Sequence, residues 1–218
     1  MHLRLLGHAA FYLESSKGTR ILTDPYQPGF KDMIHHEPIL LESDIVTVSH
    51  EHGDHSGVEN LPGKPFVLRG NGSWKIDDVE LKSYPSFHDA VSGRTRGTNT
   101  IFVITIDGFH VCHLGDLGHL INDEAIQRIG SVDILLLPVG GNFTIGPKAA
   151  LEIAIGIGAH IWIPMHYKTQ KVDFDLAFLE EFLALVEGRP VESGKELVLK
   201  RGIKLTEQGK IVILEPTL

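Results

Sequence analysis

Residues 44–55 read Asp-Ile-Val-Thr-Val-Ser-His-Glu-His-Gly-Asp-His, so an apolar, β-branched run is followed at once by three histidines and an aspartate. The run 44–49 predicts a buried β-strand, because β-branched residues favour an extended backbone. Side chains two residues apart on an extended segment point the same way, so His50 and His52 can share one ion. His55 is out of phase with them and faces a different direction. This geometry predicts two metal ions rather than one.

Short β-strands are expected on both sides of this segment in the first half of the chain. The runs that carry the strand pattern are residues 1–13, which begin a hairpin or meander, and 20–24, 65–69, 79–84, 100–106 and 110–114. Between them, residues 25–43 hold Pro25, Pro28, Gly29 and Pro38 and show little periodicity. That stretch predicts a long surface segment of the kind often found beside active sites.

After Asp116 the pattern changes to alternating helices and strands. We expect strands at 133–138, 160–165, 196–200 and 210–215, and helices at 123–129, after an N-cap at Asn122, and at 147–155. A last helix is expected to begin near Asp175 and to end at Gly188. Its apolar stripe would hold Phe178, Leu179, Phe182, Leu183 and Val186. Alternation of this kind indicates an α/β fold.

Length and composition limit the classes of protein that the chain can belong to. The 218 residues fit one large domain, 1–218, with 42% hydrophobic and 22% charged residues, as in ordinary globular proteins. Lys and Arg number 20 against 28 Asp and Glu, and the net charge of -8 disfavours an extended nucleic-acid surface. No run approaches 18 apolar residues, so we expect no membrane span. The single cysteine, Cys112, and the lack of a charged leader predict a cytoplasmic protein, and a homo-oligomer is left open.

Three later motifs extend the histidine cluster. They are Ser86-Phe-His88, Cys112-His-Leu-Gly-Asp116 and Ile163-Pro-Met-His166-Tyr167. Together with His-x-His-x-Asp-His they resemble the metallo-β-lactamase-fold hydrolases, in the order in which that superfamily presents its third histidine, bridging aspartate and last histidine. Gly7-His8-Ala9, residues 141–147 and residues 164–167 are similar to a small stand-alone group of metal-dependent hydrolases related to the ascorbate-phosphate lactonases. The resemblance implies a four-layer αββα sandwich, in which helices flank two mixed β-sheets.

Residue by residue, the resemblance assigns the ligands of two divalent ions. His50, His52 and His88 hold the first, Asp54, His55 and His166 hold the second, and Asp116 bridges them. Nitrogen and oxygen donors without thiolate suit zinc, with manganese and iron as alternatives. Two ions roughly 3.5 to 4 Å apart can share a water whose lowered pKa supplies hydroxide at neutral pH. Asp54 would additionally orient that hydroxide, which gives this ligand a catalytic role.

Seven further residues are candidates for supporting or substrate-binding roles. For each of them the alternative is a purely structural role. They are His8, Asp24, Arg94, Arg96, His113, His119 and Lys168. His8 would place a polar group at the cleft floor, and either histidine three residues from Asp116 would hold a ligand carboxylate. The two arginines follow His88 in a glycine-bounded loop, where they would clamp an anion or remain solvated.

The expected function is hydrolysis of a small, anionic ester, lactone or phosphodiester by a dinuclear metal site. One alternative is a nuclease or phosphodiesterase of RNA processing, which shares these ligands but carries an extra substrate-binding domain and a basic exosite. A second is a diiron oxidoreductase of the flavodiiron kind, which resembles His-x-Glu-x-Asp; here His52 occupies the glutamate position and no flavin domain follows. A third is a metal-binding scaffold without activity, against which the complete ligand set argues.

Overall fold

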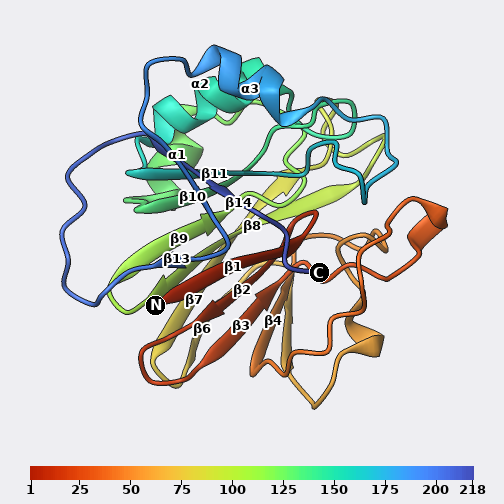
Figure 1. Ribbon diagram of the computed structural model, residues 1–218, viewed down its shortest axis with the longest axis vertical. Helices are drawn as coiled ribbons and strands as arrows, with labels where there is room; N and C mark the ends of the chain where they lie inside the picture. The colour runs from red at the N-terminus through yellow and green to blue at the C-terminus, as the bar shows by residue number, and fades with distance from the viewer.

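The computed structural model describes residues 1–218 and shows two β-sheets stacked face to face (Figure 1). The first sheet has six strands in the order β13-β1-β2-β3-β4-β5. Its strands are β1 (His2–Gly7), β2 (Ala10–Glu14), β3 (Arg20–Thr23), β4 (Ile45–Val48), β5 (Phe66–Arg69) and β13 (Leu197–Val198). The first three and β13 pair antiparallel, whereas β3, β4 and β5 run parallel, so the sheet is mixed as expected.

The second sheet has eight strands in the order β12-β14-β11-β10-β9-β8-β7-β6. They are β6 (Ser73–Ile76), β7 (Val79–Phe87), β8 (Thr98–Ile106), β9 (Phe109–His113), β10 (Ile134–Pro138), β11 (Ile161–Met165), β12 (Val191–Gly194) and β14 (Lys210–Leu214). The strands from β6 to β9 form an antiparallel meander, and those from β9 to β12 pair parallel. Each sheet is therefore mixed, and the predicted α/β class with two stacked mixed sheets is confirmed.

The main core lies between the two sheets and follows from the two-residue period of the strands. In β2, Phe11 and Leu13 point into this core, while Ala10 and Tyr12 belong to a second apolar cluster on the outer face. Phe102 in β8 comes from the facing sheet and is fully buried in the same core. Burial on both faces explains why these strands contain so few polar residues.

Helices cover only the outer face of the eight-stranded sheet (Figure 1). They are α1 (Asp123–Ile129), α2 (Pro147–Ile157) and α3 (Leu179–Leu185). The predicted cap of α1 is present, because the Asn122 side chain accepts a hydrogen bond from the Ala125 N–H at 2.9 Å. The longest helix, α2, has 11 residues, and no helix is long and apolar enough to cross a membrane.

Loop segments, rather than a helical layer, cover the outer face of the six-stranded sheet. The predicted surface segment 25–43 lies here and buries Tyr26, Ile34 and Ile39 in the outer cluster. It contains the single-turn 3-10 helix η1 (Phe30–Asp32), and η2 (Val58–Asn60) follows the histidine cluster. Both turns lie at the right of Figure 1. The segment thus contributes to the core as well as to the surface.

Three elements of the structure differ from the prediction. Strands β6 and β12 were not expected, and they are the two short edge strands of the eight-stranded sheet, with many exposed positions. The last helix begins at Leu179 and not near Asp175, so the longer prediction is wrong. Residues 172–176 form a non-helical segment with a bend at 174–175, closed by a hydrogen bond from the Leu176 N–H to the Phe174 carbonyl, and bury alternate side chains against the six-stranded sheet. Phe178 is 57% exposed and takes no part in the packing stripe of α3.

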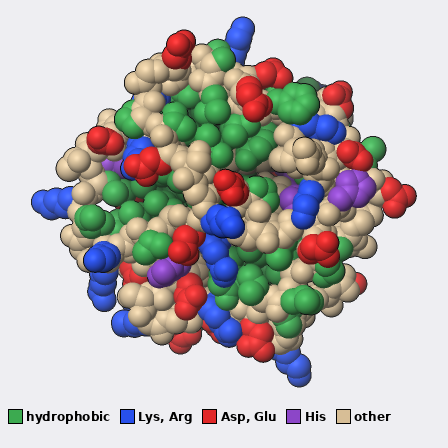
Figure 2. All heavy atoms as spheres, in the orientation of Figure 1, with side chains coloured by type: hydrophobic (Ala, Val, Ile, Leu, Met, Phe, Trp, Pro, Cys, Tyr) green, Lys and Arg blue, Asp and Glu red, His purple; other side chains and the backbone are tan.

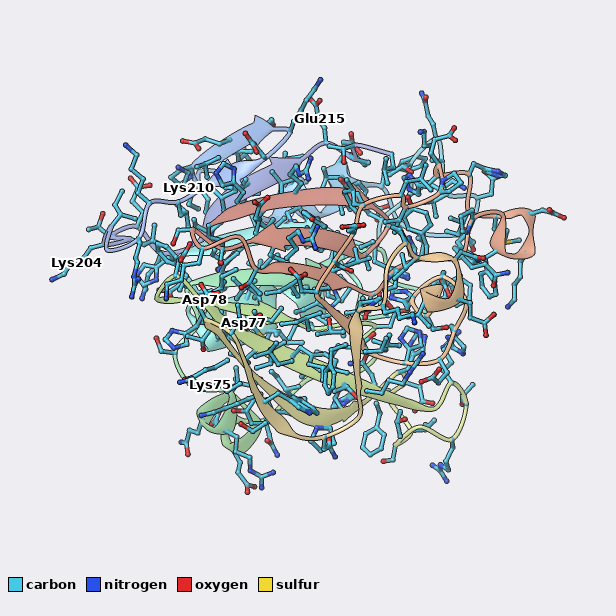
Figure 3. All side chains as sticks on the ribbon, turned by 90° about the horizontal axis from the view of Figure 1, so that it is seen from below. Lys75, Asp77, Asp78, Lys204, Lys210 and Glu215 are labelled. Carbon is cyan, nitrogen blue, oxygen red and sulfur yellow. The ribbon has the colours of Figure 1, made fainter.

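The carboxyl ends of β4, β7, β9 and β11 lie at one edge of the sandwich. The opposite edge is charged: β7 begins there, after the turn at Asp77 and Asp78, and Figure 3 labels both residues together with Lys75. Lys210, at the start of β14, lies on the same side in that view. The predicted metal ligands all belong to the first edge, where loops leave the strands.

Candidate metal centre

Nine polar residues converge where the two sheets meet at this edge. The six-stranded sheet supplies His8 from the β1–β2 turn, Asp24 from the end of β3, and His50, His52, Asp54 and His55 from the segment after β4. The eight-stranded sheet supplies His88 after β7, Asp116 after β9 and His166 after β11. The side chains that the sequence predicts as ligands therefore come from both halves of the sandwich and lie on the seam between them.

Two groups of donor atoms face the seam. His50, His52 and His88 make up the first, and His8, Asp54, His55 and His166 the second, and within each group the donor atoms lie within 4.8 Å of one another. A third set, Asp24, His50 and His55, overlaps both, so His55 is grouped apart from His52 but also lies close to His50.

Asp116 lies between the two groups. Its Oδ2 is 3.3 Å from Nε2 of His88 and 3.3 Å from Nε2 of His166, which belong to different groups. Its Oδ1 is 3.2 Å from Nε2 of His55. One carboxylate therefore faces both donor groups, which is the position a bridging ligand takes.

Several donor atoms at the seam have no hydrogen-bond partner. Nε2 of His50, Nε2 of His55 and Oδ1 of Asp116 are all buried and unpartnered. Buried polar atoms in proteins are nearly always paired, because an unpaired one costs about 1–3 kcal/mol. Metal ions held between these atoms would satisfy them, so the residues fit the ions that the donor types suggest.

Asp24 and Ser49 orient two of the imidazoles. The Asp24 carboxylate accepts hydrogen bonds from the Ser49 N–H at 2.7 Å, from the Ser49 hydroxyl, and from Nδ1 of His55 at 2.9 Å. Ser49 Oγ in turn lies 3.0 Å from Nδ1 of His50. Both contacts place the ring proton on Nδ1 and leave Nε2 free to bind a metal. The sequence suggested a supporting role for Asp24, and the structure gives it this geometry.

Asn99 positions Asp116 and was not predicted. Its Oδ1 accepts a hydrogen bond from the Asp116 N–H at 2.9 Å, and its Nδ2 donates to the Leu114 carbonyl at 2.9 Å and to Ser86 Oγ at 2.7 Å. A fully buried asparagine on a strand is unusual, because its amide must be paired. That polar residue in the apolar pattern of β8 is the signal that could have identified it.

Burial and mutual charge set the protonation states. Burial lowers the pKa of His50 to about 3 and that of His8 to about 4. Burial alone would raise the pKa of Asp116, but His166 and His55 outweigh it, so the pKa falls well below the ordinary value. Neutral imidazoles and ionised carboxylates are the forms that bind metal ions.

His55 is the exception among the histidines. Burial opposes its charged form, but the carboxylates of Asp116 and Asp54 outweigh this and raise its pKa well above the ordinary value. Without metal this ring is therefore protonated on both nitrogens and positively charged, beside the two carboxylates. An ion that binds its Nε2 must displace the proton there.

Three residues of the site have a strained backbone. His8, Asp24 and His166 have φ of 54°, 41° and 52°, in the left-handed region that non-glycine residues rarely adopt. Gly118 has a different role: a Cβ there would lie 2.3 Å from the backbone of His88 and of Asp89. Only glycine lets the loop after Asp116 pass so close behind His88.

A pocket of about 200 Å³ opens onto the donor atoms. It is lined by Phe30, Lys31, His52, Asp54, His88, Arg96, Asp116, Phe143, His166 and Phe174. Sequence analysis missed Lys31 and the three phenylalanines, which come from loops far apart in the chain. The guanidinium of Arg96 lies over the Phe143 ring, 5.2 Å from its centroid.

Asp89 fixes the loop that carries Arg96. Its buried carboxylate accepts hydrogen bonds, all at 2.8 Å, from four backbone N–H groups, those of Val91, Gly93, Thr95 and Arg96. A carboxylate that satisfies four N–H groups holds the loop in one conformation. Arg96 is therefore presented to the pocket by a rigid loop that begins directly after His88.

Two predicted substrate residues lie outside the pocket lining. The Arg94 side chain is exposed, and its Nε donates to the Val91 carbonyl at 3.0 Å. Lys168 Nζ donates to the Phe174 carbonyl at 3.2 Å, so Lys168 contacts the backbone of a residue that lines the pocket but does not line it itself. Of the two loop arginines, only Arg96 reaches the pocket.

The two histidines near Asp116 support backbone rather than a ligand carboxylate. His113 donates from Nε2 to the Ala9 carbonyl at 3.0 Å and accepts from the Gly115 N–H at Nδ1. His119 accepts from the Phe87 N–H at 3.2 Å, one residue before His88. The expectation that either would hold a ligand carboxylate by a hydrogen bond is not met, because the neighbouring backbone occupies their ring nitrogens.

Comparison with known proteins identifies the family. The sequence model of the "Beta-lactamase superfamily domain" matches residues 2–166, a range that contains both donor groups and Asp116. The chain belongs to the metallo-β-lactamase superfamily. The superfamily predicted from the motifs is thereby confirmed.

Relatives within the superfamily are metal-dependent hydrolases. The chain is 33% identical over 192 residues to a "UPF0173 metal-dependent hydrolase" of Thermococcus onnurineus, covering 77% of this chain and 84% of the relative. It is 35% identical to a Thermotoga maritima protein thought to be a zinc-dependent hydrolase of the metallo-β-lactamase superfamily; the two structures align with a TM-score of 0.78 over 98% and 97% of the chains. This metallo-β-lactamase superfamily protein is accordingly a metal-dependent hydrolase.

The fold alone does not select the reaction within this superfamily. A diiron β-hydroxylase from Streptomyces venezuelae aligns with a TM-score of 0.61 at 16% identity, over 85% of this chain and 49% of the hydroxylase. At that identity the likeness concerns the fold only. The number of ions and the substrate must therefore be argued from the residues of the site.

Proposed function

We propose that this protein is a dinuclear hydrolase, with zinc as its metal, that cleaves a small anionic ester, lactone or phosphodiester. The observation that carries the proposal is the Asp116 carboxylate, with Oδ2 at 3.3 Å from Nε2 of both His88 and His166. A mononuclear site would use one donor group and leave the other, which is buried apart from His52, without an ion. Two ions satisfy both groups at once.

The donor chemistry supports zinc. The two groups offer imidazole nitrogen and carboxylate oxygen only, a set that zinc accepts and that manganese or iron also accepts. Cys112 takes no part: it is buried on the helix-covered face of the eight-stranded sheet, and burial raises the pKa of its thiol to about 12. The site therefore lacks the thiolate that some zinc sites of other proteins use.

Divalent ions in such a site act as Lewis acids and lower the pKa of water. Asp54 lines the pocket beside the donor atoms, and its pKa lies below the ordinary value because His55 and His8 outweigh the opposing effect of burial. An ionised carboxylate in that place can accept a hydrogen bond from a water and orient it. The residues of the donor groups would thus both bind the ions and position the water.

The substrate class follows from the pocket walls. Arg96 and Lys31 line the pocket and neither forms a salt bridge with a carboxylate of the chain, although the protein carries a net charge of -8. Two unpaired cations favour a substrate with a carboxylate or phosphate group. Phe143 and Phe174 line the same pocket and favour an apolar portion. The volume of about 200 Å³ limits the bound part to a small molecule.

The pocket and the surface both argue against a nuclease. On the face drawn in Figure 2, basic and acidic side chains are interspersed between apolar areas. A nucleic acid is held chiefly by Lys and Arg along its phosphates, and the net charge of -8 disfavours such binding. A small anionic substrate therefore accounts better for the two cations in the pocket.

The test combines metal analysis with a substrate panel. Metal-reconstituted protein is expected to hold two zinc ions per chain by elemental analysis, and Asp116→Ala fewer than two. Lactones, thioesters, phosphodiesters and phosphate esters, each in anionic and neutral form, identify the bond that is cleaved. A wild-type value of one ion, unchanged in Asp116→Ala, would contradict the dinuclear site. Activity confined to long RNA would contradict the substrate class.

A further inference from the structure

His8 lies deeper in the site than its place at the end of β1 suggests. Its side chain is fully buried, and its backbone has φ of 54°. A Cβ on Gly7 would lie 2.6 Å from the His36 ring, so the chain at this turn is pressed against the segment that covers the six-stranded sheet. The turn is strained and closely packed, and it aims an imidazole at the seam.

The surroundings of the His8 ring consist of predicted metal ligands. Its Nε2 is 3.5 Å from Oδ2 of Asp54, and its centroid is 4.1 Å from that of His166 and 5.2 Å from that of His55. Neither Nδ1 nor Nε2 has a hydrogen-bond partner, although both are buried. A histidine with a purely structural role would be paired, as His113 is on both ring nitrogens.

We propose that His8 is a ligand of the second ion, together with Asp54, His55, His166 and the bridging Asp116. The inference rests on the proposed dinuclear site and adds a donor to it. The donor atoms of His8, Asp54, His55 and His166 lie within 4.8 Å of one another, so one ion can reach all of them. A metal bond pairs one of the two orphaned ring nitrogens, which no protein group does.

The additional donor makes the two sites unequal. The first has three histidines and a share of Asp116, whereas the second has three histidines, Asp54 and the other share of Asp116. More protein donors hold an ion more tightly when the other conditions are equal. The second site is therefore expected to release its ion last during stepwise chelation.

The substitutions are chosen to suit the backbone. At φ of 54° glycine and asparagine are the residues tolerated best, so His8→Gly and His8→Asn remove the imidazole without adding strain. His36→Asn is the matched control: His36 is also a buried imidazole beside this turn, but its Nδ1 contacts the Leu218 carbonyl at 2.8 Å and it belongs to neither donor group. Circular dichroism checks that each variant is folded. If His8→Gly is not folded, His8→Asn is used in its place.

The first measurement is zinc binding by competition with a chromophoric chelator. Both His8 variants are expected to bind one ion as the wild type does and the other at least about 10- to 100-fold more weakly, because losing a ligand costs no less than losing a group that supports one. His36→Asn is expected to bind both ions normally. Unchanged affinity for both ions in a folded His8 variant would overturn the proposal.

The second measurement separates a ligand from a residue that only positions Asp54. In the dicobalt protein, the free N–H of each metal-bound imidazole gives a paramagnetically shifted proton signal. His8→Gly is expected to lose one such signal, and Asp54→Asn to keep it. A full set of shifted signals in His8→Gly would overturn the ligand assignment. A wild type that binds a single ion would instead contradict the dinuclear site itself, so the two failures are distinguishable.

Discussion

Asp24→Asn tests how the site fixes the protonation of a ligand. The Asp24 Oδ1 accepts from the Ser49 N–H, while Oδ2 accepts from Nδ1 of His55 at 2.9 Å. In the variant, the amide oxygen stays opposite the Ser49 N–H, so the amide NH₂ faces His55. The amide can only donate there, so Nδ1 must accept and the ring proton moves to Nε2, the nitrogen that would bind metal. Asparagine also tolerates the φ of 41° at this position, so the fold is expected to survive.

The expected loss of zinc affinity follows from the hydrogen bonds that Asp24→Asn removes. Oδ2 loses the two hydrogen bonds that it accepts, from the Ser49 hydroxyl and from Nδ1 of His55, and the wrong tautomer of His55 is favoured. Loss of such supporting contacts typically weakens metal binding about 10- to 100-fold, or about 1.4–2.8 kcal/mol. Competition titration with zinc measures it for the ion bound by His55. Asp44→Asn is the control, because Asp44 pairs with Arg20 at the opposite end of β4. Equal zinc affinity in Asp24→Asn and wild type would refute the tautomer argument.

Four further outcomes are expected. Arg96→Ala lowers kcat/KM for anionic substrates about 10- to 100-fold and spares neutral analogues, whereas Arg94→Ala changes neither; matched kinetics on both substrate forms decide this. Exhaustive chelation lowers the Tm, because ions that bind only the native state stabilise it; calorimetry showing an unchanged Tm with metal gone would contradict a site built into the fold. Metal-free protein loses stability as pH falls from about 6.5 towards 3, because His50 takes up a proton in the unfolded chain but not in the folded one, where its pKa is about 3. In urea titrations the free energy of unfolding should fall by up to about 1.4 kcal/mol per pH unit over this range, and a free energy independent of pH would contradict the low pKa of His50. Gly118→Ala displaces His88 and weakens the first ion, and zinc affinity equal to the wild type would show that the loop can yield.

The sequence predicted the architecture well because burial imposes regular patterns. Strands buried on both faces appear as continuous apolar runs, and helix ends are marked by residues such as Asn122. The last helix was placed too early because Phe178 extends the apolar stripe of α3. Before α3 the burial alternates every second residue, with Val172, Phe174 and Leu176 buried between exposed aspartates, a pattern that argues against a helix over these residues.

The site was predictable only where its residues are close in sequence or belong to a known motif. The spacing of His50, His52 and His55 directly after a strand predicts that they are metal ligands. Lys31 and Phe143 reach the same pocket from separate loops, and no local pattern links them. Arg94 and Arg96 are equivalent in sequence; the hydrogen bonds of the Asp89 carboxylate decide which of them faces the pocket.

The metal-binding side chains come from both sheets, so the geometry of the metal centre would depend on the distance between the sheets. Phe11 and Phe102 fill the core that keeps the sheets apart, and neither contributes a donor atom. A smaller side chain at either place would let the sheets settle closer or slide, and the distance from Asp116 to His55 would change with them. We therefore expect core substitutions at Phe11 or Phe102 to change metal affinity and catalysis, so repacking the interior would be a way to retune the metal centre without altering a ligand.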